Sequence, residues 1–262
     1  MIAVRLEMAD PVVVGLSALG TLHVINQGET PVTVSSRLNL MEGDVRLLVA
    51  KPDGTKQTVT GAGGQADTAL RTVTLLPGQQ IVSSMNLLYT SAGETFPEPG
   101  NYVLQAEYFP SPRLQPVTSE PVQVTARLPQ TEDERGVAAI LKDEGVKRAL
   151  TLVESDAAPA ALEQLAARFP EMLEGKLAQL ILAGSRSVMD QASDENALSQ
   201  ASDPLALAQS INALSTPFSN VGKRLAKQFA SILENQAGAA DDSASVEKAV
   251  RILKGQPLED PS

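Results

Sequence analysis

The sequence predicts a two-part protein, with an antiparallel β-sandwich in residues 1–128 and an α-helical bundle in residues 129–262. Residues 1–128 hold 16 Val, 13 Thr and 10 Ala, whereas residues 129–262 hold 7 Val, 3 Thr and 24 Ala. Branched residues favour strands and alanine favours helices. Short apolar alternations between turn signals fill the first part, and longer helical spacings fill the second. A chain of 262 residues accommodates two domains of ordinary size.

Eight strands are predicted in the first part. The segment Ile2–Met8 alternates apolar and polar residues, which is typical of a strand with one buried face. The other predicted strands are Thr21–Asn26, Val32–Met41, Asp44–Lys51, Ala69–Leu75, Gln80–Tyr89, Asn101–Phe109 and Pro121–Arg127. Turn signals rich in Gly, Pro, Asn and Asp separate them. Because no helix is predicted between these strands, an antiparallel sandwich is favoured over a parallel α/β sheet.

Three short motifs carry a family resemblance. The segment Gly100–Ala106 resembles the G-x-Y-x-L-x-A strand of immunoglobulin-like folds. Leu75–Gln79 resembles an L-x-P-G turn, and Val24–Gly28 resembles a strand ending in N-x-G. Together they resemble bacterial immunoglobulin-like domains of the cell-adhesion-related type. The resemblance implies a sandwich in which the Tyr102 hydroxyl bonds the backbone at a corner. It also implies a domain class that serves as adhesive modules, spacers, chaperones or inhibitors, usually in exported proteins.

The second part opens with a helix signal after Pro129. Thr131 and Glu134 fit a capping box, and apolar spacing then continues to Val153 with a bend or break at Gly145. Further helices are predicted over Ala160–Phe169, Glu171–Ala183, Pro204–Leu214, Pro217–Gln236 and Ala244–Lys254. Residues 185–202 are predicted to form a loop or weak helix, residues 237–243 a linker, and the C-terminal tail to be frayed.

One of these helices has a second resemblance. The segment 161–170 resembles the second helix of a tetratricopeptide-like repeat. A solenoid needs about three repeats, and no second copy occurs at a fixed period, so a short bundle is predicted.

Composition excludes several function classes. The net charge of −10 disfavours a general binder of nucleic acid or anionic membranes, which needs a cationic surface. The absence of cysteine removes disulfides, Cys-ligated metals and thiol nucleophiles. No apolar run is long enough to span a bilayer, so a soluble protein is predicted. No signal peptide is recognised, which predicts a cytoplasmic protein if Met1 is the native start and an exported one if a leader was removed.

The sequence predicts no catalytic, cofactor-binding or metal-ligating residue. The single histidine, His23, is interpreted as an ordinary strand residue. Ser245 and Lys248 match S-x-x-K, but without the companion motifs a helix start is the preferred interpretation. The glycine-rich segments 15–20 and 61–64 lack the pattern of a nucleophile elbow or phosphate loop. The acidic clusters at 132–134 and 241–242 stand beside helix N-termini, where capping explains them.

These observations favour a non-enzymatic protein-binding or scaffold protein, with a protein partner or a second copy of the chain as its ligand. The predicted partner-binding residues form an apolar stripe on one amphipathic helix: Phe218, Val221, Leu225, Phe229 and Ile232. The basic flank of the same helix, Lys223, Arg224 and Lys227, is interpreted as a solvated face. Two alternatives stay open: a structural subunit of a larger assembly, or a hydrolase whose residues converge only in three dimensions.

Overall fold

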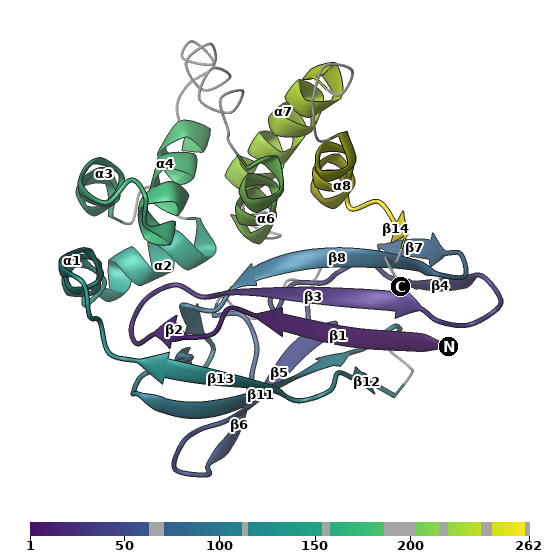
Figure 1. The fold of residues 1–262 in the computed structure, drawn as a ribbon, viewed down its shortest axis with the longest axis horizontal. Helices are drawn as coiled ribbons and strands as arrows, with labels where there is room; N and C mark the ends of the chain where they lie inside the picture. The colour runs from purple at the N-terminus through teal and green to yellow at the C-terminus, as the bar shows by residue number, and fades with distance from the viewer. Residues whose placement is uncertain are drawn as a thin grey trace.

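A computed structural model describes residues 1–62, 71–111, 115–153, 158–185, 203–214, 220–236 and 243–259. The first part of the chain supplies nearly all the strands of two larger β-sheets, and the seven described helices of the second part lie together on one side of them (Figure 1). The predicted division at residue 128 falls between the last strand of the first part and the first helix. Two predicted segments, 186–202 and 237–242, lie outside the described residues.

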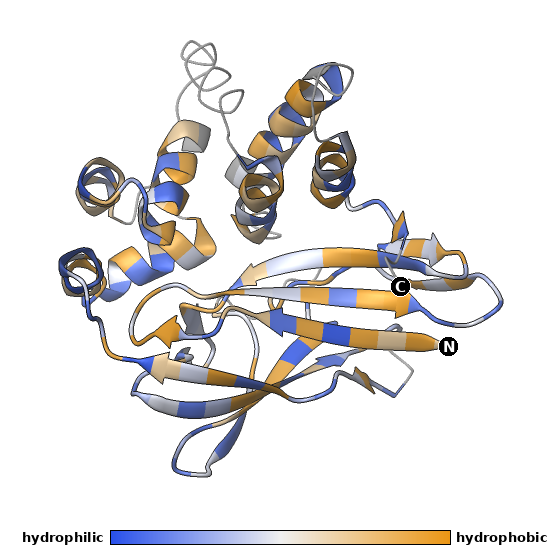
Figure 2. Ribbon diagram, viewed as in Figure 1, coloured by the Kyte–Doolittle hydropathy of each residue, from blue (hydrophilic) through white to orange (hydrophobic). Residues whose placement is uncertain are grey.

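The first sheet has the strand order β1-β3-β8-β14, and all of its neighbours are antiparallel. Its strands are β1 (Ile2–Met8), β3 (Leu19–Asn26), β8 (Gln79–Asn86) and β14 (Leu258–Glu259). The alternation predicted for β1 is confirmed, because Val4 and Leu6 face the core opposite Val24 and Leu22. Figure 2 shows this alternation of hydrophobic and hydrophilic residues along β1.

The second sheet has the order β2-β13-β11-β5-β6, with β12 also paired to β11. Its strands are β2 (Val12–Val13), β13 (Val122–Arg127), β11 (Gly100–Tyr108), β5 (Val45–Ala50), β6 (Lys56–Val59) and β12 (Val117–Thr118). Only the pair of β2 and β13 is parallel among the described pairs of this sheet. The sheets share one apolar core, to which Leu47, Leu104 and Ala106 contribute from this side.

Two small ladders complete the β part of the chain. β4 (Val32–Ser35) pairs with β7 (Thr72–Leu75), and β9 (Tyr89–Thr90) pairs with β10 (Gly93–Glu94). The predicted strand 32–41 is therefore too long, since β4 ends at Ser35 and an Asn39 turn follows it. The sequence analysis also missed β2, β6, β10 and β12, which are short.

The predicted tyrosine corner is confirmed. Tyr102 is fully buried, and its hydroxyl donates a hydrogen bond of 2.9 Å to the carbonyl oxygen of Glu98. Its ring stacks edge-on against Phe96 with centroids 5.1 Å apart. The bond satisfies a buried hydroxyl while the ring fills the core, so the start of β11 is fixed at this corner.

The described helices are α1 (Glu132–Ile140), α2 (Glu144–Leu152), α3 (Pro159–Arg168), α4 (Leu173–Ser185), α6 (Pro204–Leu214), α7 (Asn220–Gln236) and α8 (Ser243–Lys254). The bend predicted at Gly145 is a complete break two residues earlier, where Asp143 caps α2 by accepting a bond from the Gly145 amide. One continuous apolar core joins the helices, and Leu16 and Leu88 enter it from the β part. The helices and the sheets thus pack as contiguous layers.

The capping box at the start of α1 is confirmed and also ties the two parts together. Thr131 and Glu134 exchange side-chain to backbone bonds, and Glu134 additionally receives two bonds from Arg127 at the end of β13. The pairing with Arg127 is the main reason why the pKa of Glu134 is lowered to about 2. A single buried carboxylate therefore fixes the direction in which α1 leaves the sheet.

The C-terminal tail is not frayed as predicted, at least as far as residue 259. Gly255 has a positive φ of 60° and ends α8, as glycine commonly does at helix C-termini. Leu258 then pairs with Gln80 of β8, and its side chain is buried with Val82 and Ile252. Apolar burial and strand pairing at a distant edge order this tail, and neither is visible in its local sequence.

We expect Phe229→Ala to lower the free energy of unfolding by about 3–5 kcal/mol, because Phe229 is fully buried in the helical core. Asn235→Ala, at an exposed position of the same helix, should change it by no more than about 0.5 kcal/mol. Urea unfolding followed by circular dichroism measures both values. Equal stability of the two variants would contradict the placement of α7 against this core.

Glu134→Gln should lower the free energy of unfolding at pH 7 by about 1–3 kcal/mol, because charge-assisted bonds to the cap and to Arg127 are weakened. A carboxyl whose folded pKa is lowered contributes its full stability above its ordinary pKa and loses it as pH falls toward about 2. The two proteins should therefore converge in stability between pH 4.5 and pH 2. Glu132→Gln, at an exposed position in the same turn, should show no such convergence in urea unfolding across this range.

Candidate functional site

The predicted apolar stripe faces the interior of the helical layer. Leu225 and Phe229 are fully buried, and Ile232 is partly buried against the same core. Phe218 lies outside the described residues, as does the side chain of Val221. The described part of the stripe therefore holds the helical layer together, and a partner would reach it only if this layer opened.

The opposite flank of α7 lines a cleft of about 680 Å³ between the helices and the sheets. The lining residues lie on one helix face, because each is three or four residues from another of the set: Lys223, Ala226, Lys227, Ala230 and Glu234. The two alanines leave space where longer side chains would fill the cleft. The sequence analysis interpreted the lysines here as a solvated flank, and the structure places them at a concave surface.

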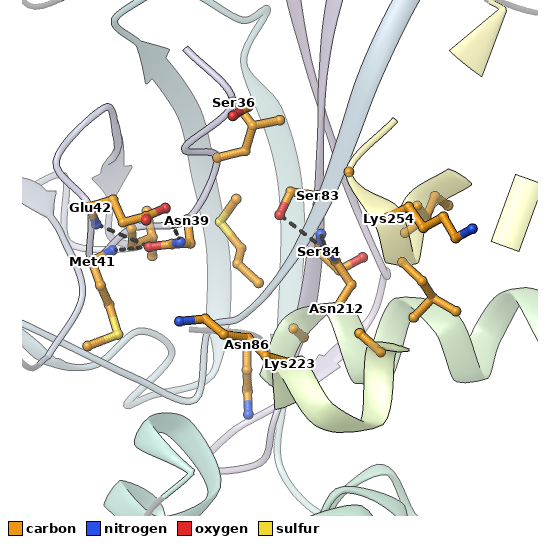
Figure 3. Close-up of a pocket in the computed structure, with 18 of the residues that line it drawn as sticks. Ser36, Asn39, Met41, Glu42, Ser83, Ser84, Asn86, Asn212, Lys223 and Lys254 are labelled. Atoms are coloured by element: carbon orange, nitrogen blue, oxygen red, sulfur yellow. Dashed lines mark hydrogen bonds between the residues drawn. The ribbon is translucent and has the colours of Figure 1, made fainter. Parts of the chain in front are cut away.

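Three other groups of residues complete the walls of the cleft. Ser83–Asn86 of β8 lie along its base, residues 38–42 form the wall opposite α7, and α6 and α8 contribute Asn212 and Lys254. Figure 3 shows Asn39, Met41 and Glu42 on one side, Asn212 and Lys254 on the other, and Ser83 and Ser84 between them. The cleft therefore lies where the helical layer meets the edge of the first sheet.

The wall opposite α7 is held by an Asn39 turn. The Asn39 side-chain oxygen accepts bonds from the amides of Met41 and Glu42, at 2.9 and 3.1 Å. Its nitrogen donates to the Glu42 carboxylate, which also pairs with Arg71. Gly61 touches this turn so closely that an added Cβ would lie 2.2 Å from Met41 Cγ. These contacts keep the turn in one conformation.

The base of the cleft contains an unusual cap on a strand edge. The Asn212 side-chain oxygen accepts a bond of 2.7 Å from the Ser84 amide and one of 3.2 Å from the Ser83 hydroxyl. Ser84 is only 2% exposed, yet its own hydroxyl has no hydrogen-bond partner within the described parts of the chain. The Thr151 hydroxyl also lines the cleft, and it too is buried without a hydrogen-bond partner among the described residues. Buried hydroxyls usually have partners, so the cleft offers unused bonding capacity to a ligand.

The cleft is electropositive although the protein is strongly acidic. Its described charged residues are four cations and two carboxylates, a balance of +2 against −10 for the whole chain: Arg71, Lys223, Lys227, Lys254, Glu42 and Glu234. Glu42 pairs with Arg71, and Glu234 pairs with Lys254 at 2.5 Å. Lys227 is exposed and has no ion-pair partner among the described residues. This arrangement favours a negatively charged ligand.

Of the glycine-rich segment 61–64, Gly61 and Ala62 line the cleft, and residues 63–64 lie outside the described residues. The remaining motifs of the sequence that the structure describes lie away from the cleft. His23 is buried on the outer face of β3, where it bonds Gln80 at 2.8 Å and approaches Glu7. Ser17, in the glycine-rich segment 15–20, donates its amide to Glu174 of α4, and burial raises the pKa of this carboxyl. Ser245 and Lys248 lie in the first turns of α8. Asp241 and Asp242 lie outside the described residues.

Sequence reasoning missed the cleft because its parts come from distant segments. A weak signal exists, since Ser83, Ser84 and Asn86 are polar residues beside the apolar part of β8, and Asn212 is a polar residue between two apolar ones on α6. Neither pattern predicts that the side chain of Asn212 lies against Ser83 and Ser84. Among the described residues, no helix is long and apolar enough to cross a membrane, and no group of three or more His, Asp or Glu side chains forms a metal-binding arrangement.

No protein-family model and no curated protein match the sequence. Among solved structures, the N-terminal half is similar to the immunoglobulin-like CARDB domain of the PF1109 protein from Pyrococcus furiosus. The two sequences are 19% identical, the match covers 48% of this chain and 88% of that chain, and the TM-score is 0.29. A β-glucosidase from Listeria innocua has 10% identity and a TM-score of 0.28, with 48% of this chain and 16% of that chain covered.

An α2-macroglobulin fragment from Escherichia coli, from domain MG7 to the C-terminus, covers more of the sequence. It has 10% identity and a TM-score of 0.30, with 97% of this chain and 62% of that chain covered. At these TM-scores the likenesses carry no argument about this protein. The tetratricopeptide-like resemblance of residues 161–170 stays a prediction.

We expect Asn212→Ala to lower the free energy of unfolding by about 1–3 kcal/mol, because the Ser84 amide loses its acceptor. Hydrogen exchange at the Ser84 amide should become faster in this variant. Asn212→Asp keeps an acceptor oxygen at the same position and should retain the slow exchange. Amide exchange measured by NMR distinguishes the variants, and unchanged exchange in Asn212→Ala would show that another group protects Ser84.

Proposed function

We propose that this chain is a non-enzymatic protein-binding or scaffold protein, in which an immunoglobulin-like sandwich carries a helical bundle and the cleft between them holds a partner protein. The observation that carries the proposal is the electropositive cleft at the junction of the two layers. It combines a concave shape, unpaired buried hydroxyls and an uncompensated lysine, which are features of a recognition site.

The strand order supports the immunoglobulin-like part of this proposal. In such sandwiches, strands A, B and E form one sheet and strands C, F and G the other. Here β1, β3 and β8 pair in one sheet, and β13, β11 and β5 pair in the other, in the corresponding chain order. The Tyr102 corner stands at the start of β11, as it does on strand F of these folds.

The placement of perturbed groups supports a non-enzymatic function. Catalytic groups commonly combine a shifted pKa with a position in a cleft. The carboxyls of Glu134 and Glu174 have shifted pKa values, as do the hydroxyls of Tyr102 and Tyr108. All four bond backbone atoms of their own fold, and none lines the described cleft. Bonding to Arg127 accounts for the lowered pKa of Glu134, and burial in the fold accounts for the raised pKa values of the other three groups.

The size of the cleft fits the recognition of a partner segment. Its volume of about 680 Å³ falls within the usual range of ligand-binding clefts. Its charged walls come from helices and a turn that are packed in place, so little ordering is needed on binding. The exposed lysine side chains stand at the rim, where they would guide an acidic partner to the cleft.

We expect Lys227→Glu to weaken binding of the partner at least tenfold, a change of about 1.4 kcal/mol. Lys56→Glu makes the same charge change at an exposed position of β6 and serves as the matched control. Each full-length protein is immobilised, proteins captured from source-cell extract are identified by mass spectrometry, and the purified partner is titrated calorimetrically. Stoichiometric capture that Lys56→Glu retains and Lys227→Glu loses supports the proposal. No stoichiometric partner, or equal affinities in all three proteins, contradicts it.

A further inference from the structure

The strand β1 is an edge of the first sheet, and no described strand pairs with its outer side. It pairs with β3 from Ile2 to Met8, and the strand order of the sheet ends there. The described helices lie on the side of β8, toward the other edge of this sheet (Figure 1). An uncovered edge presents main-chain donors and acceptors with which another chain can pair.

The other edges of the two larger sheets are covered or short. β14 and Asn212 cover β8, and β2 covers the end of β13. The Asp10 carboxylate then accepts a bond of 2.8 Å from the Thr125 amide of β13. The edge strand β6 has four residues, and Thr60, which follows it, exchanges bonds with Ser91. With seven residues, β1 is the longest uncovered edge among the described strands.

The bonding pattern shows which residues of β1 point their main-chain groups outward. In an antiparallel sheet, alternate residues of a strand bond to one neighbour, and the residues between them bond to the other side. The Met1 carbonyl accepts a bond from the Gln27 amide, so the odd-numbered residues of β1 bond to β3. The Leu87 amide bonds the Ala18 carbonyl, which agrees, because the even-numbered residues of β3 then bond to β8. The main-chain groups at the uncovered edge therefore belong to four residues: Ile2, Val4, Leu6 and Met8.

The exposure of β1 agrees with this assignment. Val4 is 8% exposed and Leu6 is 4% exposed, whereas their cross-strand neighbours Val24 and Leu22 are at 0%. All four side chains belong to the same apolar core. This difference is expected where one strand has a neighbour on only one side and the other has a neighbour on both.

The outer face of β1 carries one cation and one anion. The side chains of Arg5 and Glu7 are about half exposed and lie beside each other, with Nε and Oε1 3.2 Å apart. The second oxygen of Glu7 lies 3.3 Å from Nε2 of His23 on β3. A strand with one charge of each sign, two residues apart, is complementary to an antiparallel copy of itself.

One register of two antiparallel β1 strands satisfies both the main chain and the charges. Centring the pair on Leu6 places even-numbered residues opposite even-numbered residues, so that their outward groups bond. It also places Arg5 of each copy opposite Glu7 of the other. Centring the pair on Arg5 or on Glu7 would place like charges directly opposite each other, which is destabilising.

We propose that the β1 edge binds a second copy of this chain, in a two-fold symmetric dimer whose β1 strands pair antiparallel about Leu6 and join the two first sheets into one. Val4 then pairs with Met8 of the second copy, Leu6 with Leu6, and Met8 with Val4, and each pair exchanges two hydrogen bonds. Such a contact closes after two copies. It goes beyond the proposed function and leaves the cleft open, because no residue of β1 lines the cleft.

The test exchanges the two exposed charges in the full-length protein. Arg5→Glu and Glu7→Arg, made separately, each place like charges opposite one another in the proposed register. The two variants are complementary to each other, and the double variant is complementary to itself. Lys56→Glu makes the same charge change as Arg5→Glu at an exposed position of β6 and is the matched control. Sedimentation equilibrium at up to about 1 mM, where weak complexes are populated, measures each dimer, and a fluorescent label on one variant reports mixed dimers.

The wild-type protein should dimerise reversibly. Arg5→Glu and Glu7→Arg should each weaken self-association at least tenfold, and Lys56→Glu should weaken it less than twofold. An equimolar mixture of Arg5→Glu and Glu7→Arg should form a mixed dimer within about threefold of the wild-type affinity, and the double variant should recover self-association to the same extent. Recovery in the mixture also shows that both single variants are folded, because a misfolded strand could not restore the pairing.

Three results would overturn the inference. A wild-type protein that stays monomeric at the highest concentration has no such interface. A dimer that neither Arg5→Glu nor Glu7→Arg weakens uses another surface. Weakened single variants that do not associate when mixed show that the charges of β1 are not opposed in the proposed register.

Discussion

The arrangement of the layers depends on how the chain covers the edge and outer face of β8 that β3 does not reach. A strand at a sheet edge leaves amides and carbonyls that must be paired or covered. Since β7 pairs with β4, the chain satisfies β8 with its distant C-terminal half: β14 pairs at Gln80 and Asn212 caps Ser84. Segments more than 120 residues apart are therefore joined along one strand.

Polar contacts between the layers surround the apolar helical core. Glu174 of α4 accepts the Ser17 amide, Lys147 of α2 pairs with Glu94, and Glu134 of α1 pairs with Arg127. Such buried charges contribute little net stability but are costly to leave unpaired, so they favour one docking geometry of the helices. The cleft is the part of this junction where polar groups from both layers converge without all being paired.

Local patterns predicted much of the fold and little of the site. Alternation located β1, the tyrosine signature located the corner at Tyr102, and the capping box located the start of α1, because each depends on neighbours in sequence. β14 and the bond from Asn212 to Ser84 depend on partners far along the chain, so no local signal contains them. The amphipathic stripe of α7 shows the same limit, since its periodicity is identical whether the apolar face meets a partner or its own core.

The charge of the protein gives the cleft a selectivity that its cations alone would lack. Specificity depends on repulsion from wrong surfaces as well as attraction to the right one. With ten more acidic than basic residues overall, the protein repels an acidic segment from most of its surface, and the cleft is a local exception. Because exposed charges are screened within about 8–10 Å at physiological salt, only the lysines at the rim act on a ligand already near them.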